Sequence, residues 1–74
     1  MAYAIISDIK GLVTQGEETE EILKNRDPIS ENGGILIIHE SAKIIYSDGR
    51  EIEITGPIKI KLDSDFFENS FLFF

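Results

Sequence analysis

The sequence predicts an all-β fold, a small β-sandwich or partly open barrel of six to seven short, mostly antiparallel strands. Three observations support this prediction. Apolar and charged residues alternate at period two over residues 43–62, as in strands with one buried face. Short apolar segments recur about every 8–12 residues between turn-forming residues. The main apolar residue is isoleucine, whose β-branched side chain suits a pleated, half-buried surface.

The first strand is expected over residues 3–10, because Y-A-I-I-S-D-I-K is rich in strand-forming residues. Gly11 then allows a bend or bulge before a short second strand at residues 12–14.

Residues 15–21 are polar and acidic, and we expect them to form a hairpin loop before a short apolar return at residues 22–24. A helix over residues 17–25 is the alternative, because this segment contains good helix formers. The helix would carry one apolar pair and no sustained stripe of 3.6-residue period, so the hairpin is favoured.

Two turns follow. Pro28 fixes its own φ and moves Asp27 out of the helical region, and a second turn is expected at residues 31–34, where two glycines supply positive φ angles. The continuous apolar run at residues 35–39 is typical of a strand that is buried on both faces or that lies in the middle of a sandwich.

An Asp-Gly pair at residues 48–49 predicts a tight hairpin turn, since these residues accept the positive φ angles of a type I′ turn. A two-residue loop would place Ile45 opposite Ile52 on one face and Ile44 opposite Glu53 on the other. We therefore expect one apolar face and one mixed, wetter face. After a break at residues 56–57, alternate residues of the next strand are apolar and share a face, while the residues between them are lysines.

Phenylalanine is concentrated in residues 66–74, which we predict to form an aromatic C-terminal strand with two apolar faces. Such a strand either completes the core of its own domain or packs on a partner, for example at the open edge of a neighbouring subunit. The predicted interface residues are Phe66, Phe67, Phe71, Leu72, Phe73 and Phe74.

Size and charge limit the function further. The 74 residues form one domain, and a net charge of −7 disfavours binding to nucleic acid or to anionic membrane surfaces. No cysteine is present to form a disulfide or a thiolate metal site, and no apolar run approaches the ~18 residues of a membrane span. The N-terminus lacks the features of a signal peptide, so we expect a cytoplasmic chain or one exported without such a signal.

No catalytic constellation is evident, so we expect a protein that is not an enzyme and needs no cofactor. The single histidine, His39, is best interpreted as a structural residue at a strand end. Asp63, Asp65 and Glu68 form a D-x-D-x-x-E pattern that offers oxygen ligands to calcium. The pattern lacks the glycine turn and the ligand number of an EF-hand loop, so a solvated connecting loop is favoured.

In their order, these features resemble the N-terminal retention module of giant type I-secreted bacterial adhesins, to which FecR-like β domains are related. The family outline contains a G-x-V-like bend, an R-x-L-x-x-G-D-x-I segment, a strand, a V-x-L-x-D-G-x-x-I hairpin and a final L-D-x-x-F stretch. The similar segments here are G-L-V at 11–13, I-L-K-N-R-D-P-I at 22–29, the strand at 35–38, K-I-I-Y-S-D-G-R-E-I at 43–52 and L-D-S-D-F-F at 62–67.

The resemblance implies a domain that folds in the periplasm, is too bulky to pass the outer-membrane pore and holds the adhesin at the cell surface. It also implies export by a C-terminal signal. Two features depart from the family: Arg26 stands where the glycine before the aspartate is usual, and no adjacent alanine pair offers the family's protease site. The alternative function is a self-assembling structural subunit that forms a filament or another homo-oligomer through its C-terminal strand. A small ion- or ligand-binding accessory domain is the third and least favoured alternative.

Overall fold

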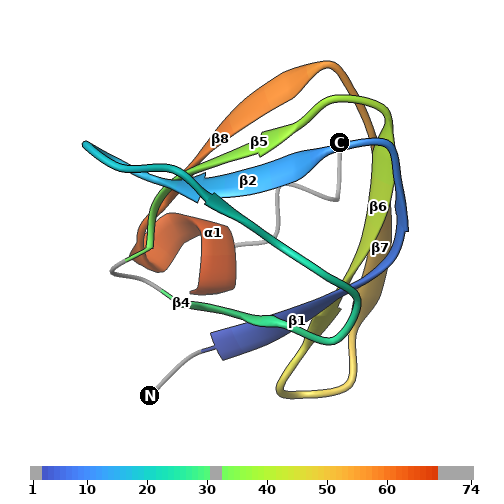
Figure 1. Cartoon of the computed structure of the whole chain (residues 1–74). Coiled ribbons are helices and arrows are strands. Elements are labelled where there is room, and N and C mark those ends of the chain that lie inside the picture. Colours follow the sequence, from blue (N-terminus) through green and yellow to red (C-terminus); the bar gives the residue numbers. More distant parts are fainter. Residues whose placement is uncertain (1–2, 31–32, 69–74) are drawn as a thin grey trace.

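The computed structural model describes residues 3–30 and 33–68, which form eight strands and one short helix (Figure 1). The all-β prediction is confirmed. The elements are β1 Tyr3–Lys10, β2 Val13–Gly16, β3 Glu21–Ile22, β4 Pro28–Ser30, β5 Gly34–Ile38, β6 Ser41–Tyr46, β7 Glu51–Thr55, β8 Ile58–Leu62 and α1 Ser64–Glu68.

The strands form two antiparallel sheets of four strands each. The first sheet has the order β4-β1-β6-β7 and the second has the order β3-β2-β5-β8. The two sheets face each other, and α1 lies between them at one end of the sandwich (Figure 1). The body measures 25 × 23 × 22 Å along its principal axes, so it is nearly isometric.

The core lies between the sheets, and strand alternation selects the residues that enter it. In β6, for example, Ala42, Ile44 and Tyr46 are buried while the residues between them are only half-buried. Fourteen side chains from both sheets, the β3–β4 connection and α1 form one cluster: Ala4, Ile6, Val13, Leu23, Ile29, Leu36, Ile38, Ala42, Ile44, Tyr46, Ile54, Leu62, Phe66 and Phe67.

The β6–β7 hairpin has a different register from the predicted one. Ile44 lies opposite Ile52, and Ile45 lies opposite Glu51, so the predicted pairing of Ile45 with Ile52 is wrong. The loop between Tyr46 and Arg50 contains three residues, with the Gly49 φ at 97°. Opposite residues share a face, and the inward residues of both strands have even numbers. Two even-numbered residues can lie opposite each other only when the loop between the strands has an odd number of residues, as the three-residue loop here does.

Strand β5 lies between β2 and β8 within a sheet of the sandwich and is buried on one face, so burial on both faces, one of the two predicted alternatives, is not found. Leu36 and Ile38 are fully buried, whereas Ile35 retains 40% of its surface. Residues 17–20 connect β2 to β3 as a hairpin loop, in agreement with the favoured interpretation, and the alternative helix over residues 17–25 is not formed.

The C-terminal strand predicted from residue 66 onwards is not found where the structure describes the chain, because Ser64–Glu68 is helical. Phe66 and Phe67 are each only 3% exposed and belong to the domain's own core, so their assignment to a partner interface is wrong. Neighbouring side chains on a strand point to opposite faces, whereas one helical turn lets both rings enter the gap between the sheets. Phe71, Leu72, Phe73 and Phe74 lie outside the described residues.

Candidate functional site

The most elaborate side-chain arrangement is the closed end of the sandwich, which consists of Tyr46, Arg50, Phe66 and Phe67. The three aromatic rings contact one another with centroids 4.9 to 6.4 Å apart, two of the three pairs in edge-to-face geometry. The guanidinium of Arg50 lies 4.4 Å from the centre of the Tyr46 ring, within the range of a cation–π contact. This end of the core is therefore packed with rings and covered by a cation.

Two side chains of the closed end bind backbone carbonyls of α1. The Tyr46 hydroxyl donates to the Phe66 carbonyl at 3.1 Å, and Arg50 Nη2 donates to the Phe67 carbonyl at 2.9 Å. Carbonyls in the last turn of a helix lack partners within the helix, and a cation there also interacts favourably with the helix dipole. Hairpin residues thus anchor the C-terminal end of α1.

The start of α1 is held by Asp63, whose Oδ1 accepts the Phe66 N–H at 3.2 Å. This is the hydrogen bond of an N-cap, which supplies a partner to one unpaired N–H of the first turn. A helix of five residues is not stable alone, so these end contacts and the buried rings hold it in place.

The closed end also contains an ion pair within the β6–β7 loop, between Asp48 and Arg50. Arg50 donates its backbone N–H and its Nε to the two oxygens of Asp48, at 3.0 and 2.7 Å, and the backbone hydrogen bond is the main cause that lowers the pKa of Asp48. Burial raises the pKa of Tyr46, which the nearby Arg50 partly offsets. The phenol is therefore neutral at physiological pH and donates a hydrogen bond. This arrangement supports a structural role for the closed end.

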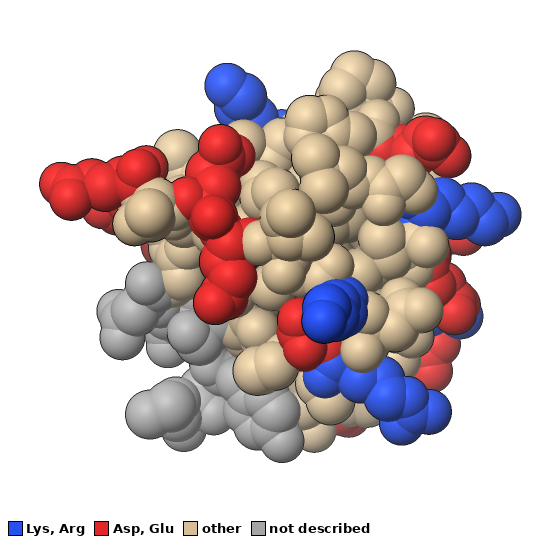
Figure 2. Space-filling model, viewed as in Figure 1, with Lys and Arg blue, Asp and Glu red and all other residues tan. Residues whose placement is uncertain are grey.

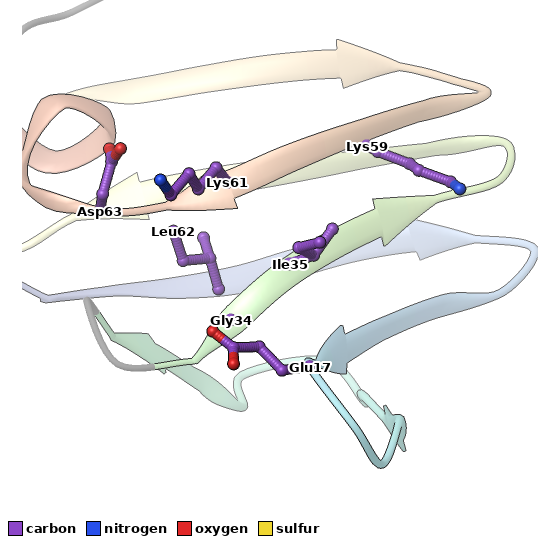
Figure 3. Close-up of a pocket in the computed structure, with 7 residues that line it drawn as sticks. All are labelled: Glu17, Gly34, Ile35, Lys59, Lys61, Leu62 and Asp63. Carbon is purple, nitrogen blue, oxygen red and sulfur yellow. The ribbon is translucent and has the colours of Figure 1, made fainter.

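A second feature is an open cleft of about 560 Å³ on the outer side of the second sheet (Figure 3). Ile35 and Gly34 form its floor, Glu17 stands on the side of the β2–β3 hairpin, and Lys59 and Lys61 project from β8. Glu17 borders the cleft on the hairpin side, and the β8 side carries two amines together with the Asp63 carboxylate that follows the strand.

Of the three acidic residues predicted as weak metal ligands, the structure describes the side chains of Asp63 and Asp65. Asp63 caps α1 through Oδ1, and the described residues contain no group of three His, Cys, Asp or Glu side chains that could hold a metal ion. The side chain of Glu68 lies outside the described part of the chain. His39 directly follows β5 and is exposed, and its backbone N–H donates to the Leu12 carbonyl at 3.1 Å.

Three positions of the family-like motifs have positive φ angles: 76° at Gly11, 75° at Arg26 and 97° at Gly49. The Arg26 N–H donates to the Ile6 carbonyl at 2.7 Å, which fixes the turn against β1. Arg26 therefore adopts a left-handed conformation at the position where the family outline has glycine.

Sequence reasoning missed Tyr46 and Arg50 as functional candidates. The one feature of the sequence that could have indicated them is their position on either side of the Asp-Gly turn. Nothing in the sequence indicates that Arg50 reaches residue 67, because that contact depends on a helix that the pattern did not predict.

The comparisons with protein-family models, curated proteins and solved structures give no match to this chain. Across residues 3–30 and 33–68, the structure contains no helix with the length and hydropathy needed to cross a membrane.

Proposed function

We propose that this chain is a non-enzymatic structural domain of the retention-module kind, a folded plug that anchors an attached protein at the cell surface. The observation that carries the proposal is the closed end, where Tyr46 and Arg50 bind the carbonyls of α1 and fix two phenylalanine rings in the core. The result is a folded body that measures at least 22 Å in every direction.

The mechanism requires only size and resistance to unfolding. A chain that is exported unfolded passes a narrow pore until it reaches a segment that has already folded. A body of 25 × 23 × 22 Å with a core drawn from both sheets must unfold cooperatively before it can pass. In this proposal, the domain acts in the periplasm and arrests a secreted protein in the outer-membrane pore.

The family-like positions support the proposal at the level of residues. The Gly11 bend and the Gly49 turn have the positive φ angles for which glycine is suited. In the L-D-x-x-F segment, Leu62 and Phe66 are buried. Asp63, which lies between them in the sequence, caps the start of α1. Each of these residues performs a structural task.

The test is to fuse the domain to the N-terminus of a type I-secreted passenger that keeps its own C-terminal export signal. Passenger protein is then measured on the cells and in the medium by immunoblot. We expect the wild-type domain to keep the passenger on the cells and Ile44→Asp to release it, because Ile44 is fully buried and a charge there unfolds the core.

A matched control is Leu12→Asp, which places the same charge at a side chain that is 43% exposed. This variant should retain the passenger as the wild type does. If the wild type and Ile44→Asp release equal amounts of passenger into the medium, the domain is not a plug.

A further inference from the structure

The outer face of the second sheet carries an apolar centre, which the proposed plug does not use. Ile37 lies opposite Thr14 on one side and Lys59 on the other, and Thr14 lies opposite Ile22. Opposite residues share a face, so these side chains form one row across the sheet. Ile35 and Lys61 form the next row. Ile22 is 63% exposed and Ile35 is 40% exposed, so apolar surface remains in contact with water.

The two strand edges of this face differ in charge. Lys59 and Lys61 stand on β8, and Glu17 borders the cleft on the hairpin side (Figure 3). Asp63 also lines the cleft beyond the end of β8, where its Oδ1 accepts the Phe66 N–H. The space-filling view shows acidic side chains gathered where the β2–β3 hairpin projects from the body (Figure 2). The ion pairs found within residues 3–30 and 33–68 involve Lys43 and Arg50, so Glu17, Lys59 and Lys61 are not paired there.

We propose that this face binds a second copy of the same chain, with the two-fold axis parallel to β5. Rotation about that axis brings the two outer faces together and places the β8 side of one copy against the hairpin side of the other. Lys61 of each copy then meets Glu17 of its partner, and the isoleucines meet at the centre. An axis perpendicular to the strands would instead place lysines against lysines.

The interface is small. Four strands about 4.8 Å apart, each about five residues long at ~3.3 Å per residue, give a face of roughly 19 × 17 Å. This area of about 320 Å² per copy is well below the ~800 Å² per partner of a stable specific interface, so we expect only a weak dimer that forms reversibly at high protein concentration.

The experiment is sedimentation velocity over a concentration series at about 0.15 M salt, where the Debye length of ~8 Å screens the net negative charge. The wild type should shift from monomer to dimer as concentration rises. Lys61→Glu and Glu17→Lys should each raise the dissociation constant about tenfold, because each creates two like-charge contacts in the symmetric pair.

The most informative sample in the sedimentation experiment is an equimolar mixture of the two variants. A Lys61→Glu chain carries two acidic residues at these positions and a Glu17→Lys chain carries two basic ones, so the mixed pair regains both attractions. The mixture should dimerise as tightly as the wild type. Circular dichroism establishes that each variant is folded, which is expected because both side chains are exposed.

The matched control is Lys10→Glu, which makes the same charge change at an exposed residue of the first sheet. It should leave the dissociation constant unchanged. A wild type that stays monomeric throughout the series would overturn the proposal, as would a mixture that associates no better than either variant alone. Neither result affects the plug, which acts as a folded monomer.

Discussion

Within residues 3–30 and 33–68, Arg26 and Asp8 are the non-glycine residues with a positive φ angle. The Arg26 φ of 75° lies in the left-handed region, where a Cβ is unfavourable, and the Arg26 N–H is fixed by the Ile6 carbonyl. The side chain itself is exposed and contributes no core packing.

Arg26→Gly should therefore stabilise the domain by about 1 kcal/mol, since removal of the backbone strain exceeds the greater flexibility of glycine in the unfolded chain. Chemical denaturation monitored by circular dichroism measures this change. Lys24→Gly, in the same connection but without a positive φ, should not stabilise the domain. An unchanged or lower midpoint for Arg26→Gly would contradict the assignment of strain.

Tyr46 couples the hairpin to α1 through one hydrogen bond, which Tyr46→Phe removes. The ring stays in the core, but the Phe66 carbonyl loses its donor in a buried environment. We expect a loss of about 1–2 kcal/mol in the free energy of unfolding, measured by denaturant titration. A loss below the error of the titration would mean that water replaces the hydroxyl at no cost.

Tyr46 should also make stability depend on alkaline pH. Burial raises its pKa above the ordinary value of 10.0, so the folded state binds this proton more tightly than the unfolded state. Its contribution is complete below pH 10 and is lost as pH rises through the folded pKa. Lys43, whose pKa is raised mainly by its hydrogen bond to Asp8, acts with the same sign above its ordinary value of 10.5.

Denaturation midpoints of the wild type should thus fall on the alkaline side of pH 10. Those of Tyr46→Phe should fall less steeply, because only the Lys43 contribution remains of the two. Parallel curves for the two proteins would show that the Tyr46 phenol titrates normally in the folded state.

Among the secondary-structure elements, α1 closes one end of the sandwich. Phe66 and Phe67 fill the gap between the sheets, and α1 is capped by Asp63 and anchored by Arg50. The described core cluster extends from Ala4 to Phe67.

We therefore expect deletion of residues 71–74 to leave the domain folded, with an unchanged elution volume in size-exclusion chromatography. Phe66→Ala should in contrast cost about 3–5 kcal/mol, enough to unfold a domain of this size. Loss of a large species on deletion would favour assembly through Phe71, Leu72, Phe73 and Phe74.

Alternation predicted the longer strands well because strands such as β6 have one buried face. The first strand was expected at residues 3–10 and is observed as Tyr3–Lys10. Register was harder to predict, because an Asp-Gly pair fits a two-residue or a three-residue loop, and only the inward pairing of Ile44 with Ile52 selects the latter.

The closed end could not be predicted from local pattern. Two adjacent phenylalanines are compatible both with a strand that has two apolar faces and with a helical turn. Which of the two forms depends on the space between the two sheets, which local sequence does not reveal. The contact between Arg50 and the Phe67 carbonyl follows from that choice.

The whole molecule is a compact two-sheet body with one described core cluster. The acidic surface, with a net charge of −7, favours solubility and opposes close approach to anionic membrane surfaces. Two chemically different faces remain: the closed end, which serves stability, and the outer face of the second sheet, which we assign to self-association.

In the proposed function, retention of the passenger depends on the folded body and on no single reactive group. The measurement that tests it most directly is the fraction of passenger retained on cells for a series of fusions that differ only in the stability of the domain: Arg26→Gly, wild type, Tyr46→Phe and Phe66→Ala. The account predicts full retention while the domain stays folded and release for Phe66→Ala. Equal retention of an unfolded Phe66→Ala domain would contradict it.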